Sequence, residues 1–169
     1  QQLRRQDVGL SPKAGLTELE HAVQLDRSSV LANTFMGLYW ERQQDYSQAQ
    51  YYLGQAITNS PDDPILYTEV GNILSKAGDL PAALSAFEKA ITLAPQDPLF
   101  DRLKAEFALE NQIQIRELAL PPARQALMLN PDDPESLDLM AKVMLELQDY
   151  YSAEGYAQAA INADPGYTP

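Results

Sequence analysis

Four prolines at almost regular intervals limit how this chain can fold more than any other feature. Pro61, Pro95, Pro131 and Pro165 are separated by 34, 36 and 34 residues. Three residues after each of the first three stands another proline, and an aspartate precedes it. These dipeptides are Asp63-Pro64, Asp97-Pro98 and Asp133-Pro134. A pattern that returns at such intervals is typical of chains built from one small unit, repeated and stacked.

The two prolines of each pair act differently on a helix. The first ends the preceding helix, because its ring clashes with the turn before it and it has no amide hydrogen to donate. The Asp-Pro dipeptide predicts the start of the next helix. The carboxylate accepts a free backbone N–H at the positive end of the helix dipole, and proline at the first helical position loses no hydrogen bond.

Between these boundaries the sequence predicts two helical segments per unit. In residues 64–93 the first segment has large or small apolar residues at i, i+3, i+4 and i+7, and the second has Ala-x3-Phe-x2-Ala. Gly78 separates them and is free to take the positive φ that ends many helices. The same positions align without a gap in the two regular neighbouring units. They are Tyr67, Val70, Gly71, Leu74, Ala83, Phe87 and Ala90; Asn33, Met36, Gly37, Trp40, Ala49, Leu53 and Ala56; and Leu137, Met140, Ala141, Met144, Ala153, Ala157 and Ala160.

A helical hairpin of 34 residues with this order of large and small positions resembles the tetratricopeptide repeat. The resemblance implies an all-α fold, an α-α superhelix in which antiparallel hairpins form a right-handed solenoid with a concave groove lined by the first helices. We expect a single domain over residues 1–169, divided into a partial repeat (1–26), repeats at 30–63 and 64–97, an irregular repeat (98–133) and a last repeat (134–167). The chain starts without Met or a signal-peptide pattern, so we expect a fragment of a larger protein. It resembles bacterial repeat proteins, so we expect that protein to be bacterial.

Small residues at equivalent places have a packing explanation. We expect Gly37, Gly71 and Ala141 to lie where the two helices of a hairpin cross at short distance. One hairpin cannot bury both of its faces, so neighbouring hairpins must stack.

The unit over 97–131 is longer and departs from the pattern. Its apolar residues Phe100, Leu103 and Phe107 fall one place early, and either Lys104 or Ala105 takes the small position. No break separates its helices, and Pro121-Pro122 follows, which a helix interior does not accept. Two interpretations fit: a lengthened first helix with a second that starts near Pro121, which we favour, or a second helix kinked there. The insertion is either a tolerated local irregularity or a point at which two molecules exchange halves.

Composition excludes several classes of function. The formal net charge is −12, and a field of that sign repels phosphate backbones, so we expect no nucleic-acid partner. No stretch is long and apolar enough for a membrane span. The absence of cysteine excludes disulfides and thiolate metal sites, and leaves both cytoplasm and periplasm open.

Catalytic residues are not found in a usable pattern. His21 is the only histidine, and we interpret it as a solvated helix residue, because metal and catalytic sites need several converging groups. Helix capping explains the aspartates of the Asp62-Asp63 and Asp132-Asp133 pairs that precede proline. There is no glycine-rich phosphate loop and no Ser–His–Asp set. We therefore predict no enzyme, no cofactor and no metal.

The resemblance implies that selected residues of the first helices line the groove. They are Thr34, Leu38, Glu41, Thr68, Asn72, Ser75, Asp138, Lys142 and Leu145. Tetratricopeptide clamps for acidic chaperone tails carry a Lys/Asn/Lys/Arg set there; this chain keeps Asn72 but has Thr34 and Leu38 in place of the first basic and amide residues. We predict a scaffold that binds a peptide or partner helix, through shape more than charge. The alternative is a structural element that associates with itself, as a homodimer swapped through 98–133.

Overall fold

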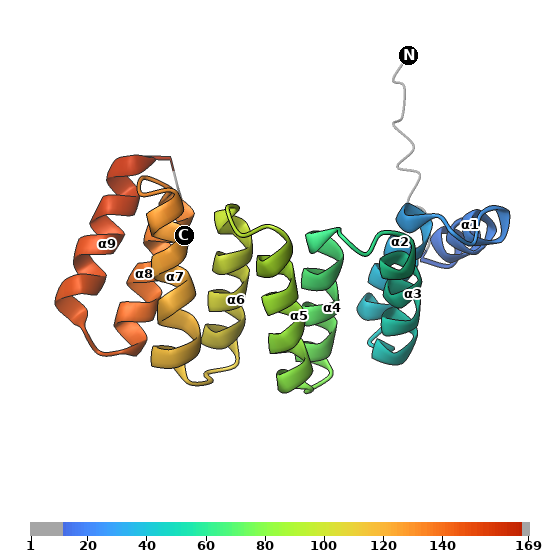
Figure 1. Ribbon diagram of the computed structural model, residues 1–169, viewed down its shortest axis with the longest axis horizontal. Coiled ribbons are helices and arrows are strands. Elements are labelled where there is room, and N and C mark those ends of the chain that lie inside the picture. Colours follow the sequence, from blue (N-terminus) through green and yellow to red (C-terminus); the bar gives the residue numbers. More distant parts are fainter. Residues whose placement is uncertain (1–11, 167–169) are drawn as a thin grey trace, which may run out of the picture. The chain divides into compact units, whose positions relative to one another are not determined.

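The computed structural model describes residues 12–166, with side chains from residue 15 onward (Figure 1). In this range all regular elements are helices, which confirms the all-α class. The helices are α1 (Pro12–Leu25), α2 (Val30–Arg42), α3 (Tyr46–Asn59), α4 (Pro64–Lys76), α5 (Leu80–Leu93), α6 (Pro98–Glu110), the π-helix η1 (Ile115–Ala119), α7 (Leu120–Leu129), α8 (Pro134–Glu146) and α9 (Tyr150–Ala163). None of these described helices has the length and apolar character needed to span a bilayer.

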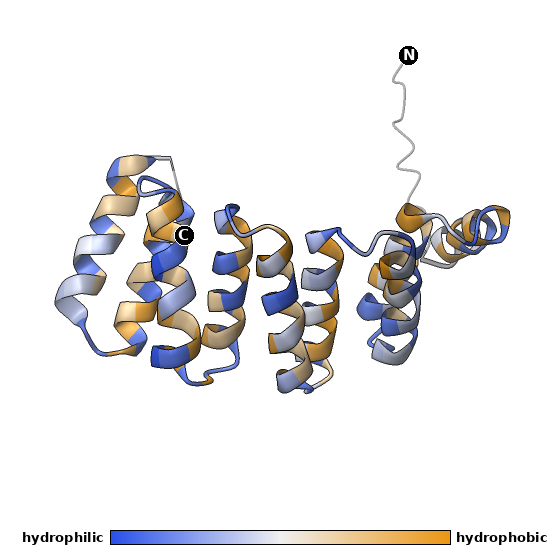
Figure 2. Ribbon diagram, in the orientation of Figure 1, coloured by the Kyte–Doolittle hydropathy of each residue, from blue (hydrophilic) through white to orange (hydrophobic). Residues whose placement is uncertain are grey.

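The chain divides into two compact units, of which the first ends at Pro61 and the second begins at Asp62. In the first unit α2 contacts both α1 and α3. The second unit contains the hairpins α4–α5, α6–α7 and α8–α9 in succession (Figure 1). Here the first helices also contact one another, α4 with α6 and α6 with α8, so they form one continuous wall. Most turns between the helices of this unit are hydrophilic (Figure 2).

The predicted helix starts are confirmed. The helices α4, α6 and α8 begin at the proline of each Asp-Pro dipeptide. The carboxylates of Asp63, Asp97 and Asp133 each accept a backbone N–H two or three residues later, at 2.9–3.0 Å. The second helices of the regular hairpins are capped in the same way by aspartates. These caps satisfy amides that have no partner inside a helix.

Each complete first helix ends in the same kind of turn. The sequence indicated the positive φ of this turn at only one place, Gly78. A residue with positive φ follows the helix, and it is Gln44, Gly78, Gln112 or Gln148. Its N–H donates to the carbonyl three residues earlier, and the next N–H donates to the carbonyl five residues earlier. This pair of bonds is the Schellman motif. Glycine at 78 was recognisable, whereas glutamine has no particular preference for positive φ and gave no signal.

The favoured interpretation of the irregular hairpin was wrong about its first helix, which is not lengthened. The helix α6 has 13 residues, as α4 and α8 do, and a turn separates it from the next helix. The extra residues lie beyond that turn. Ile113 stands where the regular hairpins have a capping aspartate, Gln114 takes a second positive φ, and η1 leads into α7.

Two local properties explain this arrangement. Ile113 cannot cap a helix and packs instead against the apolar clusters on both sides of it. Pro121 and Pro122 lie in the first turn of α7, the part of an α-helix in which proline is best tolerated. The wider π-turn takes up the added residues, and α6 still contacts η1 and α7 of its own chain.

The crossing of the two helices in a hairpin is as close as the small residues predicted. A Cβ placed on Gly37 would lie 2.7 Å from Cγ of Leu53, and one on Gly71 would lie 2.9 Å from Cε2 of Phe87. In the irregular hairpin Ala105 takes this place and is fully buried. The register of α6 is therefore the same as in the regular hairpins, and only the positions of its large apolar residues differ.

We predict that Gly71→Ala destabilises the fold by about 1–3 kcal/mol, because the added methyl group overpacks the ring of Phe87. Urea unfolding followed by circular dichroism measures the change. Gly155→Ala is the matched control. Gly155 lies in α9 with nothing within 4 Å of an added Cβ, so the same substitution should stabilise by about 0.5–1 kcal/mol through helix propensity. Equal effects at both sites would contradict the close crossing.

Candidate functional site

The predicted groove residues divide between the two units. Thr34, Leu38 and Glu41 lie on α2 of the first unit. The other six lie on α4 and α8 of the second unit and are described together with the wall of first helices. They are Thr68, Asn72, Ser75, Asp138, Lys142 and Leu145.

On α4 the predicted residues differ in accessibility. Thr68 is 3% exposed, and its hydroxyl donates to the carbonyl of Ile65 at 2.8 Å, so it is closed to a partner. Asn72 is half-buried and lines a recess between α4 and α6. Ser75 lines the same recess and is hydrogen-bonded to the side chain of Asn111 at 3.0 Å.

A hollow of the wall lies between α6 and α8 and has a volume of about 580 Å³. Asp138 and Lys142 line it, whereas Leu145 lies on a neighbouring surface formed by α8 and α9. The remaining lining residues are Leu99, Arg102, Leu103, Glu106, Leu109, Glu110, Glu135 and Leu139. Leucines and charged side chains therefore line one opening.

The sequence did not lead us to place any α6 residue in the groove, because we took the apolar residues of this helix to fall one place early. Asp101 and Lys104 stand where other first helices have large apolar residues, while Phe100 and Phe107 fill the core instead. Phe107 stacks against Phe87 of the preceding hairpin, with ring centroids 5.0 Å apart. Counting from Pro98, as in the regular units, would have placed the polar residues of α6 in the groove.

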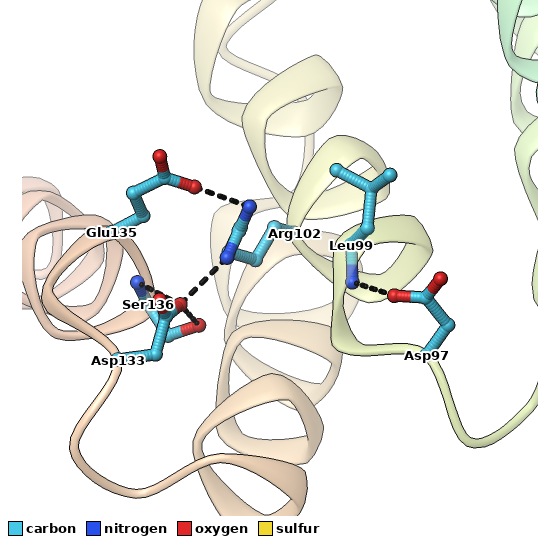
Figure 3. A network of polar contacts seen from close by, with 6 residues as sticks. All are labelled: Asp97, Leu99, Arg102, Asp133, Glu135 and Ser136. Atoms are coloured by element: carbon cyan, nitrogen blue, oxygen red, sulfur yellow. Dashed lines mark hydrogen bonds and ion pairs between the residues drawn. The ribbon is translucent and has the colours of Figure 1, made fainter.

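One end of the hollow is held by a network around Arg102 (Figure 3). Its guanidinium donates to Asp133 at 2.6 Å and pairs with Glu135, so α6 is bound to the start of α8. Ser136 also donates to Asp133. Burial alone raises the pKa of Asp133, but the hydrogen bonds from Ser136 and Arg102 outweigh it and lower the pKa.

The other cation of the hollow is also engaged within the fold. Lys142 and Asp138, one turn apart on α8, form an ion pair at 2.6 Å. Asp138 is almost buried, at 9% exposure, so its charge is balanced by Lys142 rather than by water.

Two carboxylates of the hollow differ from these. Glu106 and Glu110 lie one turn apart on α6, and within residues 15–166 no ion pair or hydrogen bond reaches either. The side chain of Glu106 is open to the hollow, yet the surrounding helices remove part of its hydration, and this raises its pKa. Arg102 and Lys142 act in the opposite direction, while Glu110 and Glu135 add to the rise.

The described part of the chain contains no cluster of candidate metal ligands. No group of three or more His, Asp or Glu side chains there is placed to hold a metal ion. His21 is an exposed residue of α1.

Comparison with known proteins identifies the repeat. Residues 42–107 match the family model of the tetratricopeptide repeat. This segment, about two fifths of the chain, therefore contains tetratricopeptide repeats. No curated protein sequence matches it.

Several solved structures share the tetratricopeptide fold of this chain. PilW, described as a widely conserved type IV pilus biogenesis factor, has a TM-score of 0.75 at 18% identity, over 95% of this chain and 73% of that one. MamA from Desulfovibrio magneticus RS-1 has a TM-score of 0.73 at 17% sequence identity, and the match covers 94% of this chain and 89% of that one. A thermophilic tetratricopeptide protein of Thermus thermophilus has a TM-score of 0.71 at 17% sequence identity, and the match covers 92% of this chain and 84% of that one. At these identities the likeness shows the fold alone.

We predict that Asp133→Ala destabilises the protein by about 2 kcal/mol at pH 7, because it removes both a helix cap and a charged hydrogen bond. Asp97→Ala is the control, since Asp97 caps α6 through the N–H of Leu99 and is not joined to Arg102 in Figure 3; it should cost about 1 kcal/mol. Urea unfolding measures both, and equal losses would contradict a structural role for Arg102.

The same residue gives a pH dependence with a definite sign. The pKa of Asp133 is lower in the folded state, so its contribution is present above the unfolded pKa of about 3.9 and is lost as the pH falls through the folded pKa. The stability difference between wild type and Asp133→Asn should therefore shrink at about pH 2.5.

We predict the opposite behaviour for Glu106→Gln, which should be slightly more stable than wild type at pH 7. The pKa of Glu106 is raised on folding, so the stabilising contribution of its neutral form is lost as the pH rises through the folded pKa. Glutamine keeps that neutral form at every pH. Thermal unfolding at pH 7 and at about pH 3 measures the effect, which should vanish in acid. Glu88→Gln is the control and should give no gain, because Glu88 pairs with Lys104 at 2.9 Å.

Proposed function

We propose that this chain is a protein-interaction scaffold and that the wall formed by α4, α6 and α8 binds a segment of a partner protein. The observation that carries the proposal is the hollow of about 580 Å³ between α6 and α8, in which leucines and charged groups meet. Apolar contacts at the centre with a polar surround are the usual composition of a protein interface.

The wall favours recognition through side chains. The backbone groups of the wall helices are already bonded within the helices and their caps, so no strand edge is offered for pairing. A bound segment would place apolar side chains between the leucines. The amide of Asn72, in the adjoining recess, is suited to bond the backbone of such a segment because it both donates and accepts.

Preorganisation supports this mode of binding. Arg102 ties α6 to the start of α8, and the caps of both helices are satisfied, so the wall needs little ordering when a partner binds. Leu145, on the neighbouring surface of α8, extends the proposed binding surface of this unit. For the first unit, the proposed contacts are the equivalent positions on α2, which are Thr34, Leu38 and Glu41.

The test uses peptides selected on the wild-type protein from a random display library. We predict that Asn72→Ala combined with Leu99→Ala weakens the most enriched peptide about tenfold, as measured by fluorescence anisotropy. The matched control removes an amide and an apolar side chain from an exposed face: Gln125→Ala with Met128→Ala on α7 should change the affinity less than about twofold.

Two results would count against the proposal. One is a selected peptide whose affinity the two double variants change equally, because its site would then lie elsewhere. The other is a failure to enrich any peptide, combined with a dimer in light scattering that Asn72→Ala/Leu99→Ala dissociates; that result would favour self-association.

A further inference from the structure

We infer that the bound segment is basic as well as apolar, and that a lysine or arginine of the partner binds Glu106 and Glu110. This inference rests on the proposed function and specifies the chemistry of its ligand. The observation that carries it is that the cations of the hollow are paired with carboxylates of this chain, whereas two carboxylates of the hollow have no cation at ion-pair distance within the described residues.

The cations of the hollow are already used by the fold. Arg102 is bound to Asp133 and Glu135, and Lys142 is bound to Asp138. Glu106 and Glu110 are left, within the described residues, with no cation at ion-pair distance. The lining therefore has two cationic and four anionic side chains, and its surplus is negative.

The two glutamates are placed where a ligand would pass. Both line the hollow between α6 and α8, and both also line the recess between α4 and α6 that contains Asn72. Like charges one turn apart on a helix repel each other and weaken the helix. A cation between the two carboxylates would relieve this repulsion.

Apolar groups stand beside this cation site. Leu99, Leu103 and Leu109 come from α6, and Leu139 comes from α8. A basic residue flanked by leucine-like residues would therefore match the lining. The net charge of −12 adds long-range attraction for such a segment, while an acidic segment would meet four carboxylates.

The experiment uses the peptide most enriched by display selection, in its selected form and with its basic residue changed to glutamine. We expect the enriched sequences to combine Lys or Arg with Leu, Ile, Met or Phe. Glu106→Gln combined with Glu110→Gln should weaken the selected peptide about tenfold but leave the glutamine form unchanged, which a double-mutant cycle in fluorescence anisotropy measures.

A matched control separates direct pairing from the overall field. Asp62→Asn with Asp132→Asn removes the same amount of charge from two exposed turn positions, and it should change the affinity less than about twofold. An equal loss in both double variants would overturn the inference in favour of long-range attraction alone.

The outcomes also separate this inference from the proposed function. If the enriched peptides lack basic residues, or ignore Glu106→Gln/Glu110→Gln while Asn72→Ala/Leu99→Ala weakens them, the groove binds a segment of another kind and only the inference fails. If neither pair of substitutions affects binding, both fail. Circular dichroism and urea unfolding of each variant ensure that a loss of binding is not a loss of fold.

Discussion

The close crossing of two helices within each hairpin is the contact on which the rest of the structure depends. At Gly37 and Gly71 the partner helix approaches so closely that even a methyl group has no room, and Ala105 and Ala141 take the corresponding places in the other hairpins. A hairpin closed in this way still leaves apolar surface on its flank, as the stacking of Phe87 on Phe107 shows. The next hairpin of the second unit covers that surface, so the first helices come to lie side by side.

The irregular hairpin shows what this arrangement tolerates. Its added residues are placed after the inter-helix turn, in η1, and none of them lies in α6. Because α6 keeps the length and register of α4 and α8, its polar residues face the same wall. Residues inserted into α6 ahead of Arg102 would have rotated Arg102 and Glu106 away from α8, since each added residue turns the following helical positions by about 100°. The insertion is thus placed where it leaves the candidate site intact.

Local signals in the sequence predicted local features well. The Asp-Pro starts, the turn at Gly78 and the small crossing positions all follow from properties of one residue and its chain neighbours. The positive φ of Gln148 was not predictable, because the turn at the end of α8 requires it of a residue with no such preference. The pairing of Arg102 with Asp133 joins residues 31 positions apart, and it required knowledge of which helices are neighbours.

The carboxylates of the wall fall into two groups with different physical roles. Asp138 is nearly buried and Asp133 is half-buried. Each is bonded to a cation, and their charges are part of how α6 and α8 are held. Glu106 and Glu110 face the open hollow without such a partner, and folding raises the pKa of Glu106. A charged group that weakens the fold where it stands is better explained by contacts the fold does not provide. In the proposed complex these contacts bring a cation to the two glutamates, and the leucines beside them contact apolar groups of the same segment.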